Sequence, residues 1–148
     1  MRARDLVGSV PSVTPAEPLL DAVARLVRAG TAGIAVVDET GVPRAVLPGS
    51  ELVGLAVPTY VKEDPSLAAV LADADPRVLR ARIARLTVAD VLADAEPDPL
   101  PVVDADASLL EVAATMADAR VGIVLAVDAH GQYIGAITAT DLLATLQQ

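Results

Sequence analysis

An internal duplication constrains this sequence more than any other feature. Shifted by 90 residues, the segment 13–52 aligns with the segment 103–142 without a gap. Apolar residues then coincide at the spacing of an amphipathic helix, with one apolar stripe in each copy. The stripe comprises Leu19, Leu20, Val23, Leu26 and Val27 in the first copy, and Leu109, Leu110, Ala113, Met116 and Ala117 in the second. The sequence therefore predicts two copies of one structural unit.

A tight turn is expected between two short apolar runs in each copy. Asp38 and Gly41 match Asp128 and Gly131, and an aspartate three residues before a glycine is typical of such turns. Each copy therefore reads strand, helix, strand, turn, strand, helix, and the expected fold class is α/β, in the broad α+β sense. The predicted elements are 12–14, 18–29, 33–37, 44–47 and 50–57 in the first copy, and 101–104, 108–119, 122–127, 133–137 and 140–147 in the second.

The duplication also divides the chain into parts. We expect a first repeat at 1–57, a helical insert at 58–86 and a second repeat at 87–148, with short helical leaders at 3–7 and 88–92. A single repeat of about 55 residues would bury too little apolar surface by itself. The two repeats should therefore pack together as a pseudo-twofold pair.

The insert has proline signatures for two extra helices, one beginning near Pro65 and one at Pro76. In the second helix, apolar residues share one face and arginines occupy the rest. The apolar residues are Leu79, Ile83 and Leu86, and the arginines are Arg77, Arg80, Arg82 and Arg85. Two interpretations stay open: a docked helix with a solvated basic face, or a basic surface for an acidic partner or for ligand phosphates.

The charge balance and composition exclude several classes of protein. Eleven Lys and Arg against twenty Asp and Glu give a net charge of -9, so the chain lacks the cationic surplus that binding nucleic acid requires. The absence of cysteine excludes disulfides and thiolate zinc sites, and is compatible with the cytoplasmic location that we expect. No apolar run approaches the roughly 20 residues of a membrane helix, and no signal peptide is expected.

Catalytic and metal-binding patterns are also missing. The only histidine, His130, falls in a predicted turn, so no positioned base for a nucleophile is apparent. Neither phosphate-binding glycine motif occurs. The acidic stretch from Asp94 to Asp106 lacks the glycine and closing glutamate of a calcium loop. We therefore expect neither an enzyme nor a metal protein.

The segment GAITATDLL, residues 135–143, runs from a predicted strand directly into a predicted helix. Thr138 and Asp141 there have the spacing of a helix capping box. The N-terminus of a helix also offers N–H groups and a positive dipole end to an anion. The same spacing occurs at Thr14–Glu17, Thr87–Asp90 and Ser108–Glu111, so capping alone and ligand binding both stay open.

With these motifs the layout resembles a tandem pair of cystathionine-β-synthase-type (CBS) domains, a regulatory module. The likeness covers nearly the entire chain, and the segment 135–143 is its most specific part. It implies two repeats packed through their sheets, often as a homodimer, with up to two clefts for adenosine-type ligands such as AMP, ATP, adenosine or S-adenosylmethionine.

The resemblance also implies which residues bind such a ligand in the second repeat. Asp141 would bind the ribose hydroxyls, and Thr138 and Thr140 would face the phosphate. The adenine would be held by residues of the first and second strands, here Val103, Gly122, Ile123 and Val124, and the nearest cation is Arg120.

The first repeat departs from that pattern. Pro48 stands in the Thr138 position and Glu51 in the Asp141 position, and proline supplies neither a hydroxyl nor an N–H group. We therefore expect at most one occupied site, in the second-repeat cleft. Because some family members hold phosphates with His or Arg where this chain has Gly122 and Ile123, AMP, adenosine or S-adenosylmethionine should fit better than ATP.

The functional hypothesis is a non-catalytic regulatory sensor, for example of cellular energy state, with no required cofactor. Binding of the adenosyl ligand would change how the repeats, or the two chains of a homodimer, pack. The alternative is a ligand-free dimerisation and docking module for a transporter or a metabolic enzyme.

Overall fold

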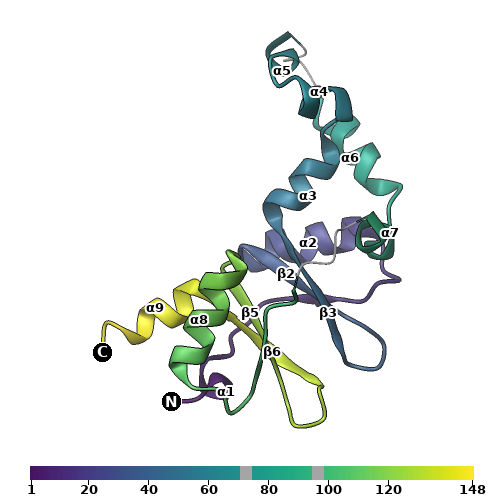
Figure 1. The fold of residues 1–148 in the computed structure, drawn as a ribbon. Helices are drawn as coiled ribbons and strands as arrows, with labels where there is room; N and C mark the ends of the chain where they lie inside the picture. Colours follow the sequence, from purple (N-terminus) through teal and green to yellow (C-terminus); the bar gives the residue numbers. More distant parts are fainter. Residues whose placement is uncertain (71–74, 95–98) are drawn as a thin grey trace.

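Helices and strands follow the predicted order in the computed structural model (Figure 1). The structure describes residues 1–70, 75–94 and 99–148. The first repeat comprises β1 (Ser12–Val13), α2 (Leu19–Ala29), β2 (Gly33–Val37), β3 (Pro43–Pro48) and α3 (Gly49–Ala56). The second comprises β4 (Val102–Asp104), α8 (Leu109–Ala119), β5 (Ile123–Val127), β6 (Tyr133–Thr138) and α9 (Ala139–Thr145). The predicted α+β class with two β-α-β-β-α units is confirmed.

Each repeat forms its own three-stranded sheet with the second strand in the middle. β1 pairs parallel with β2, which pairs antiparallel with β3, and β4, β5 and β6 repeat this pattern. The register shifts between Val36 and Val37 in one hairpin and between Ala126 and Val127 in the other. Such irregularities increase local twist, so the duplication is preserved in the shape of the hairpins.

The leader helices α1 (Ala3–Leu6) and α7 (Val88–Asp94) each pack on the repeat that they do not precede (Figure 1). The Ala3 N–H donates to the Ala107 carbonyl at 2.9 Å, and Leu6 joins the core of the second repeat. The Val88 N–H donates to the Glu17 carbonyl at 3.0 Å, and Val88 is buried in the core of the first repeat. The chain therefore crosses twice between the repeats and interlocks them.

The core has three parts. One apolar cluster lies under the first repeat, with α7, and a second lies under the second repeat, with α1. A third joins the two sheets and comprises the buried residues Val10, Ala35, Ile123, Leu125 and Ala136. Residues from both repeats meet in this third cluster, so a change there alters how the repeats sit against each other.

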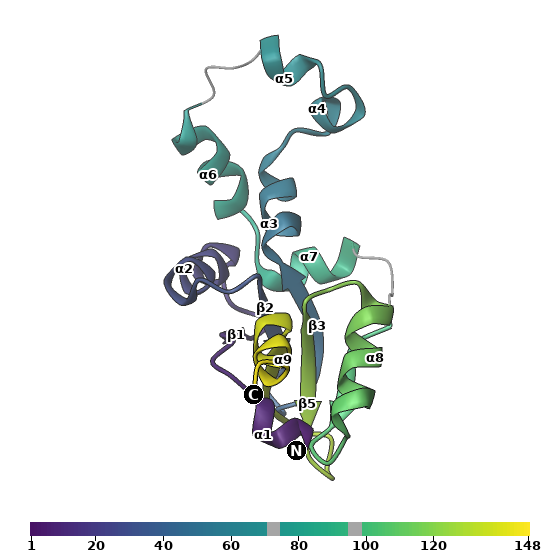
Figure 2. The same cartoon turned by 90° about the vertical axis from the view of Figure 1, so that its left-hand side faces the viewer.

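The insert projects away from the two sheets as an arm (Figures 1 and 2). It comprises α4 (Thr59–Glu63), α5 (Leu67–Val70) and α6 (Pro76–Ala84). The helices near Pro65 and at Pro76 were predicted, whereas α4, which begins after Pro58, was not. Ile83 and Leu86 pack against the core of the first repeat, as the apolar face predicts. The arginines Arg77, Arg80, Arg82 and Arg85 are exposed.

The described ranges were also searched for a membrane-spanning helix and for a metal-binding group of side chains. Among them, no helix is long and apolar enough to cross a bilayer. Searched over the same ranges, the side chains of His, Asp and Glu form no group of three or more that could hold a metal ion. Part of the acidic stretch from Asp94 to Asp106, including Glu96 and Asp98, lies outside the described residues.

Candidate functional site

Thr138 and Asp141 form a complete capping box at the start of α9. One carboxylate oxygen of Asp141, Oδ2, accepts from the Thr138 N–H at 2.9 Å and from the Thr138 hydroxyl at 2.7 Å. The Asp141 N–H donates back to the Thr138 hydroxyl at 3.1 Å. These bonds satisfy groups that a helix start otherwise leaves unpaired. The capping interpretation is therefore observed, and both capping bonds to the carboxylate fall on Oδ2.

The short segment after α1 lies directly on this capping box. The Gly8 N–H donates to the Ala136 carbonyl at 2.9 Å, which ties the segment to β6. A β-carbon on Gly8 would stand 3.0 Å from Asp141 Oδ2 and 3.5 Å from Oδ1. The absence of a side chain at Gly8 is what permits this close approach. Residue 8 therefore occupies space beside the carboxylate that the family resemblance assigns to the ribose.

The other predicted residues separate into different environments. Ile123 pairs with Thr138 in the sheet, and the Gly122 carbonyl accepts from the Ala139 N–H at 2.9 Å, so both lie close to the capping box. Val103 and Val124 are buried in the cluster that α1 covers. Thr140 is exposed on α9.

Arg120 lines a cavity of about 660 Å³ that involves the equivalent junction of the first repeat. Neither Thr138 nor Asp141 contributes to its walls. The cavity lies between β3 and the start of α3 on one side, and the C-terminal end of α8 with the segment before β4 on the other. Its lining comprises Arg44, Ala45, Val46, Leu47, Pro48, Glu51, Leu92, Pro99, Leu100, Pro101, Thr115, Asp118, Ala119, Arg120 and Val121. Both repeats therefore contribute walls to it.

The junction of the first repeat has no capping box. Pro48 is the N-cap residue of α3 and has no side-chain capping bond. Glu51, which replaces the capping aspartate, is exposed and lines the cavity. Because Pro48 cannot form the capping box, the Glu51 carboxylate does not cap α3 and lies at the cavity wall.

The two leaders differ in the length of chain that follows them. Asp5 and Asp90 hold the same place in the leaders but are 85 residues apart, whereas the repeats are offset by 90. The connection before β4 is therefore five residues longer than the one before β1. The shorter connection lies on Asp141, while residues 99–101 of the longer one line the cavity beside Glu51. This difference in spacing was present in the sequence and could have indicated the more open junction.

The backbone of Arg120 is left-handed, with φ 56° and ψ 20°, at the C-cap of α8. Its N–H donates to the Met116 carbonyl at 3.2 Å and ends the helix. The equivalent residue in the first repeat is Gly30, with φ 67°, whose N–H donates to Leu26 at 2.9 Å. Glycine adopts this conformation without cost, and arginine does not. Among the described residues, Arg120 is the only non-glycine with a positive φ.

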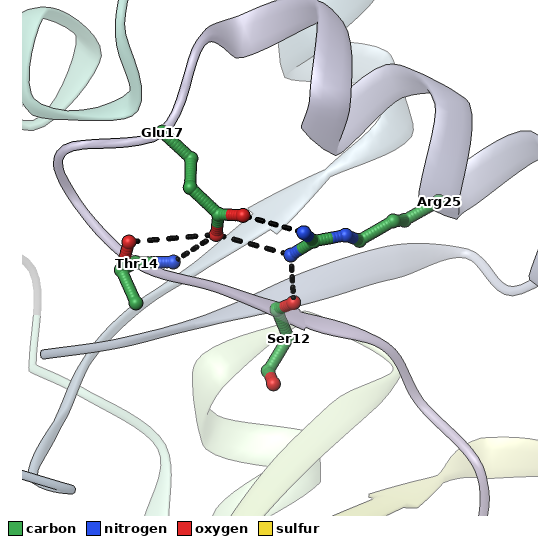
Figure 3. Close-up of polar contacts among 4 residues, drawn as sticks. All are labelled: Ser12, Thr14, Glu17 and Arg25. Atoms are coloured by element: carbon green, nitrogen blue, oxygen red, sulfur yellow. Dashed lines mark hydrogen bonds and ion pairs between the residues drawn. The ribbon is translucent and has the colours of Figure 1, made fainter. Parts of the chain in front are cut away.

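A charged network fixes the start of the first repeat (Figure 3). The Glu17 carboxylate accepts from the Thr14 N–H at 2.7 Å and from the Arg25 guanidinium, which also donates to the Ser12 carbonyl at 2.8 Å. Hydrogen bonding to Arg25, with a further contribution from the Thr14 N–H, lowers the pKa of Glu17. Arg25 and Glu17 are thus engaged with each other, so this network has a structural role.

Comparison with known proteins gives a consistent result. The family model described as CBS domain matches residues 3–54 and 88–148. The crystal structure of a CBS domain-containing protein of unknown function from Kribbella flavida is 38% identical, with a TM-score of 0.85, and the match covers 100% of this chain and 99% of that one. The search among curated proteins found no match.

Two more distant structures share the fold. CBSX2, a protein of Arabidopsis thaliana, was crystallised in complex with AMP; it is 23% identical, with a TM-score of 0.68, over 99% of this chain and 96% of that one. A CBS domain-containing protein of unknown function from Bacillus anthracis is 19% identical, with a TM-score of 0.73, over 99% and 93%.

Proposed function

Because this chain belongs to the CBS domain family, as a pair of repeats of that regulatory kind, we propose that it binds an adenosine-containing ligand and responds through the packing of its repeats. The AMP complex of CBSX2 supports this class of ligand, since that protein has the same fold. The cavity volume of about 660 Å³ lies in the ordinary range for small-molecule sites.

The observation that carries the proposal is the combination of this cavity with Glu51. A carboxylate can accept hydrogen bonds from the two hydroxyls of a ribose. Glu51 lines the cavity and makes no capping bond, whereas Asp141 caps its helix beside Gly8. We therefore place the ligand at the first-repeat junction. The Thr138–Asp141 junction, favoured by the sequence motif, is the second candidate for the same ligand.

The position of the cavity suggests how binding would be transmitted. Leu47 and Glu51 belong to the first repeat, and Thr115 and Arg120 belong to the second. A ligand that contacts both walls binds best in one relative arrangement of the repeats, so it shifts the population toward that arrangement. No chemical step is needed for this response.

Titration calorimetry with AMP, ADP, ATP, adenosine and S-adenosylmethionine tests the proposal, using the wild type and the variants Glu51→Gln, Asp141→Asn and Glu39→Gln. Glu39 is an exposed residue of the first hairpin and does not line the cavity, so it serves as the charge-matched control. We expect saturable binding of at least one ligand, weakened about tenfold or more by Glu51→Gln alone. Loss in Asp141→Asn alone would move the site to the second repeat. If no ligand binds at millimolar concentration, the proposal is wrong.

A ligand-free docking module is the other candidate function. Val53 on α3 and Leu143 on α9 occupy the same position in the two repeats, and they are 67% and 61% exposed. Large apolar side chains repeated on an exposed surface are a feature of interfaces. We propose a homodimer as the first partner to test, by sedimentation of the wild type and of Val53→Ser with Leu143→Ser. If the wild type and the variant are both monomeric, the homodimer is ruled out, and a transporter or a metabolic enzyme is the next partner to test.

A further inference from the structure

We propose that Arg120, together with Arg44, makes the cavity selective for an adenosine ligand that carries one phosphate group, over the uncharged nucleoside and over cationic S-adenosylmethionine. This inference rests on the proposed function, because it concerns the same cavity. It identifies a specificity-determining pair of residues that the family motif does not contain.

The first observation is the backbone of Arg120. Residues other than glycine enter the left-handed region at a cost, and such strain is typically retained at functional sites. The first repeat ends its equivalent helix with Gly30 in nearly the same conformation, φ 67° against 56°, without that cost. Glycine would therefore end the helix α8 at least as well as arginine does. The Arg120 side chain is the reason to look for another role.

The second observation is where the two arginine residues lie. Arg120 and Arg44 line the cavity from different repeats, Arg120 at the end of α8 and Arg44 on β3. The Arg120 residue is exposed, and the Arg44 side chain is 59% exposed. The ion pair of Arg44 with Asp38 is long, at 3.7 Å, so it restrains the guanidinium only weakly. A guanidinium donates to phosphate oxygens in a planar, often bidentate arrangement.

The charge balance of the cavity limits the number of phosphates. Its lining carries two arginines and two carboxylates, Glu51 and Asp118. If Glu51 binds the ribose, the two guanidinium groups face one phosphate group of about two negative charges. A triphosphate would bring further charges into a chain whose net charge is already -9. An uncharged nucleoside gives the two guanidinium groups no phosphate to bind, and a sulfonium ligand adds a positive charge beside them.

The decisive comparison is the ratio of AMP to adenosine affinity in the wild type, Arg120→Gly, Arg44→Gln and Arg80→Ala. Arg120→Gly restores the residue that the first repeat uses, so the fold should be kept and the thermal midpoint should rise. Arg80 lies on α6 and does not line the cavity, which makes Arg80→Ala the control for a lost positive charge. We expect Arg120→Gly and Arg44→Gln each to weaken AMP about tenfold, with adenosine affinity unchanged and Arg80→Ala like the wild type.

Failure of this inference is distinguishable from failure of the proposed function. If AMP and adenosine bind equally, or if Arg120→Gly keeps the wild-type ratio, while Glu51→Gln abolishes binding of both, the cavity is the site but the arginines do not select the ligand. If the wild type prefers S-adenosylmethionine, the selectivity is the reverse of that proposed. If no adenosyl ligand binds the wild type, the proposed function and this inference are both wrong.

Discussion

Gly33 and Ile123 hold the same position in the two repeats, and they contact each other where the repeats pack together. A β-carbon on Gly33 would lie 3.0 Å from Ile123 Cδ1 and 2.9 Å from the Leu47 carbonyl oxygen. Ala35 and Leu125, which are likewise equivalent, share the cluster that joins the sheets. A small residue in the first repeat thus matches a large one in the second. The interface is close-packed because the copies have diverged in complementary ways.

Gly33→Ala should destabilise the protein by about 1–3 kcal/mol, because the added methyl group crowds the Leu47 carbonyl in its own repeat and Ile123 across the interface. Part of the loss should be recovered in the double variant with Ile123→Val, which removes Cδ1 but leaves the Leu47 carbonyl in place. Urea unfolding measures both. Gly49→Ala is the control, since the nearest atom to its β-carbon would be at 3.4 Å. Equal stability of Gly33→Ala and Gly49→Ala would show that the β2–β3 hairpin and the interface both accommodate the methyl group at no cost.

Much of the fold could be predicted because the two repeats carry the same pattern, so each helix and hairpin is indicated twice in the sequence. The amphipathic stripe and the Asp-to-Gly turns identified both helices and both hairpins, and the boundaries differ mainly at caps. The predicted helices at 18–29 and 108–119 begin one residue early, because Pro18 and Ser108 are N-cap residues. Local sequence determines these features.

The packing of the leaders could not be predicted in the same way. Both leaders carry the same pattern, and either could cover the core of either repeat by hydrophobicity alone. Each leader packs on the repeat that it does not precede, and this choice depends on tertiary contacts such as the hydrogen bond from the Ala3 N–H to the Ala107 carbonyl. The position of the cavity also depends on tertiary packing. The connection before β1 lies on the Asp141 junction, and the connection before β4 lies beside the Glu51 junction. The sequence motif identified the capping box at Thr138, but not the space beside Asp141 that Gly8 occupies.

Tyr133→Phe should leave stability unchanged or raise it by up to about 1 kcal/mol. The Tyr133 hydroxyl is buried, and it has no hydrogen-bond partner in the described part of the chain. An unsatisfied buried hydroxyl costs free energy that phenylalanine avoids. Burial also raises the pKa of Tyr133 above its usual 10.0. Its neutral form is favoured in the folded state, so stability should fall as pH rises through and above 10, and less so in the variant.

The measurement is thermal unfolding of wild type and Tyr133→Phe at pH 7 and near pH 10.5. Tyr60→Phe is the control, because Tyr60 is 56% exposed. A clear loss of stability in Tyr133→Phe at pH 7 would mean that the hydroxyl has a partner, such as a buried water molecule.

Glu17→Gln should reduce stability at neutral pH by about 0.5–1 kcal/mol, a modest value because the Glu17 and Arg25 side chains are 25% and 39% exposed. The pKa of Glu17 is lowered from its usual 4.5, mainly by hydrogen bonding to Arg25. The contribution is therefore present above about pH 4.5 and is lost as pH falls through the folded-state pKa. Urea unfolding at pH 7 and near pH 3 should show wild type and variant converging in acid. A constant difference at both pH values would contradict the assignment.

Thr138→Ala separates capping from ligand binding at the second junction. Loss of the cap should cost about 1 kcal/mol, because the Asp141 N–H loses its acceptor. Thr87→Ala is a matched control, since the Thr87 hydroxyl accepts from the Asp90 N–H at 3.3 Å in the same kind of cap, and Thr87 does not line the cavity. With the ligand at Glu51, the two variants should lose similar stability in thermal unfolding and keep wild-type AMP affinity in calorimetry. A drop in affinity confined to Thr138→Ala would instead mean that the hydroxyl contacts the ligand, and that Gly8 moves aside when it binds.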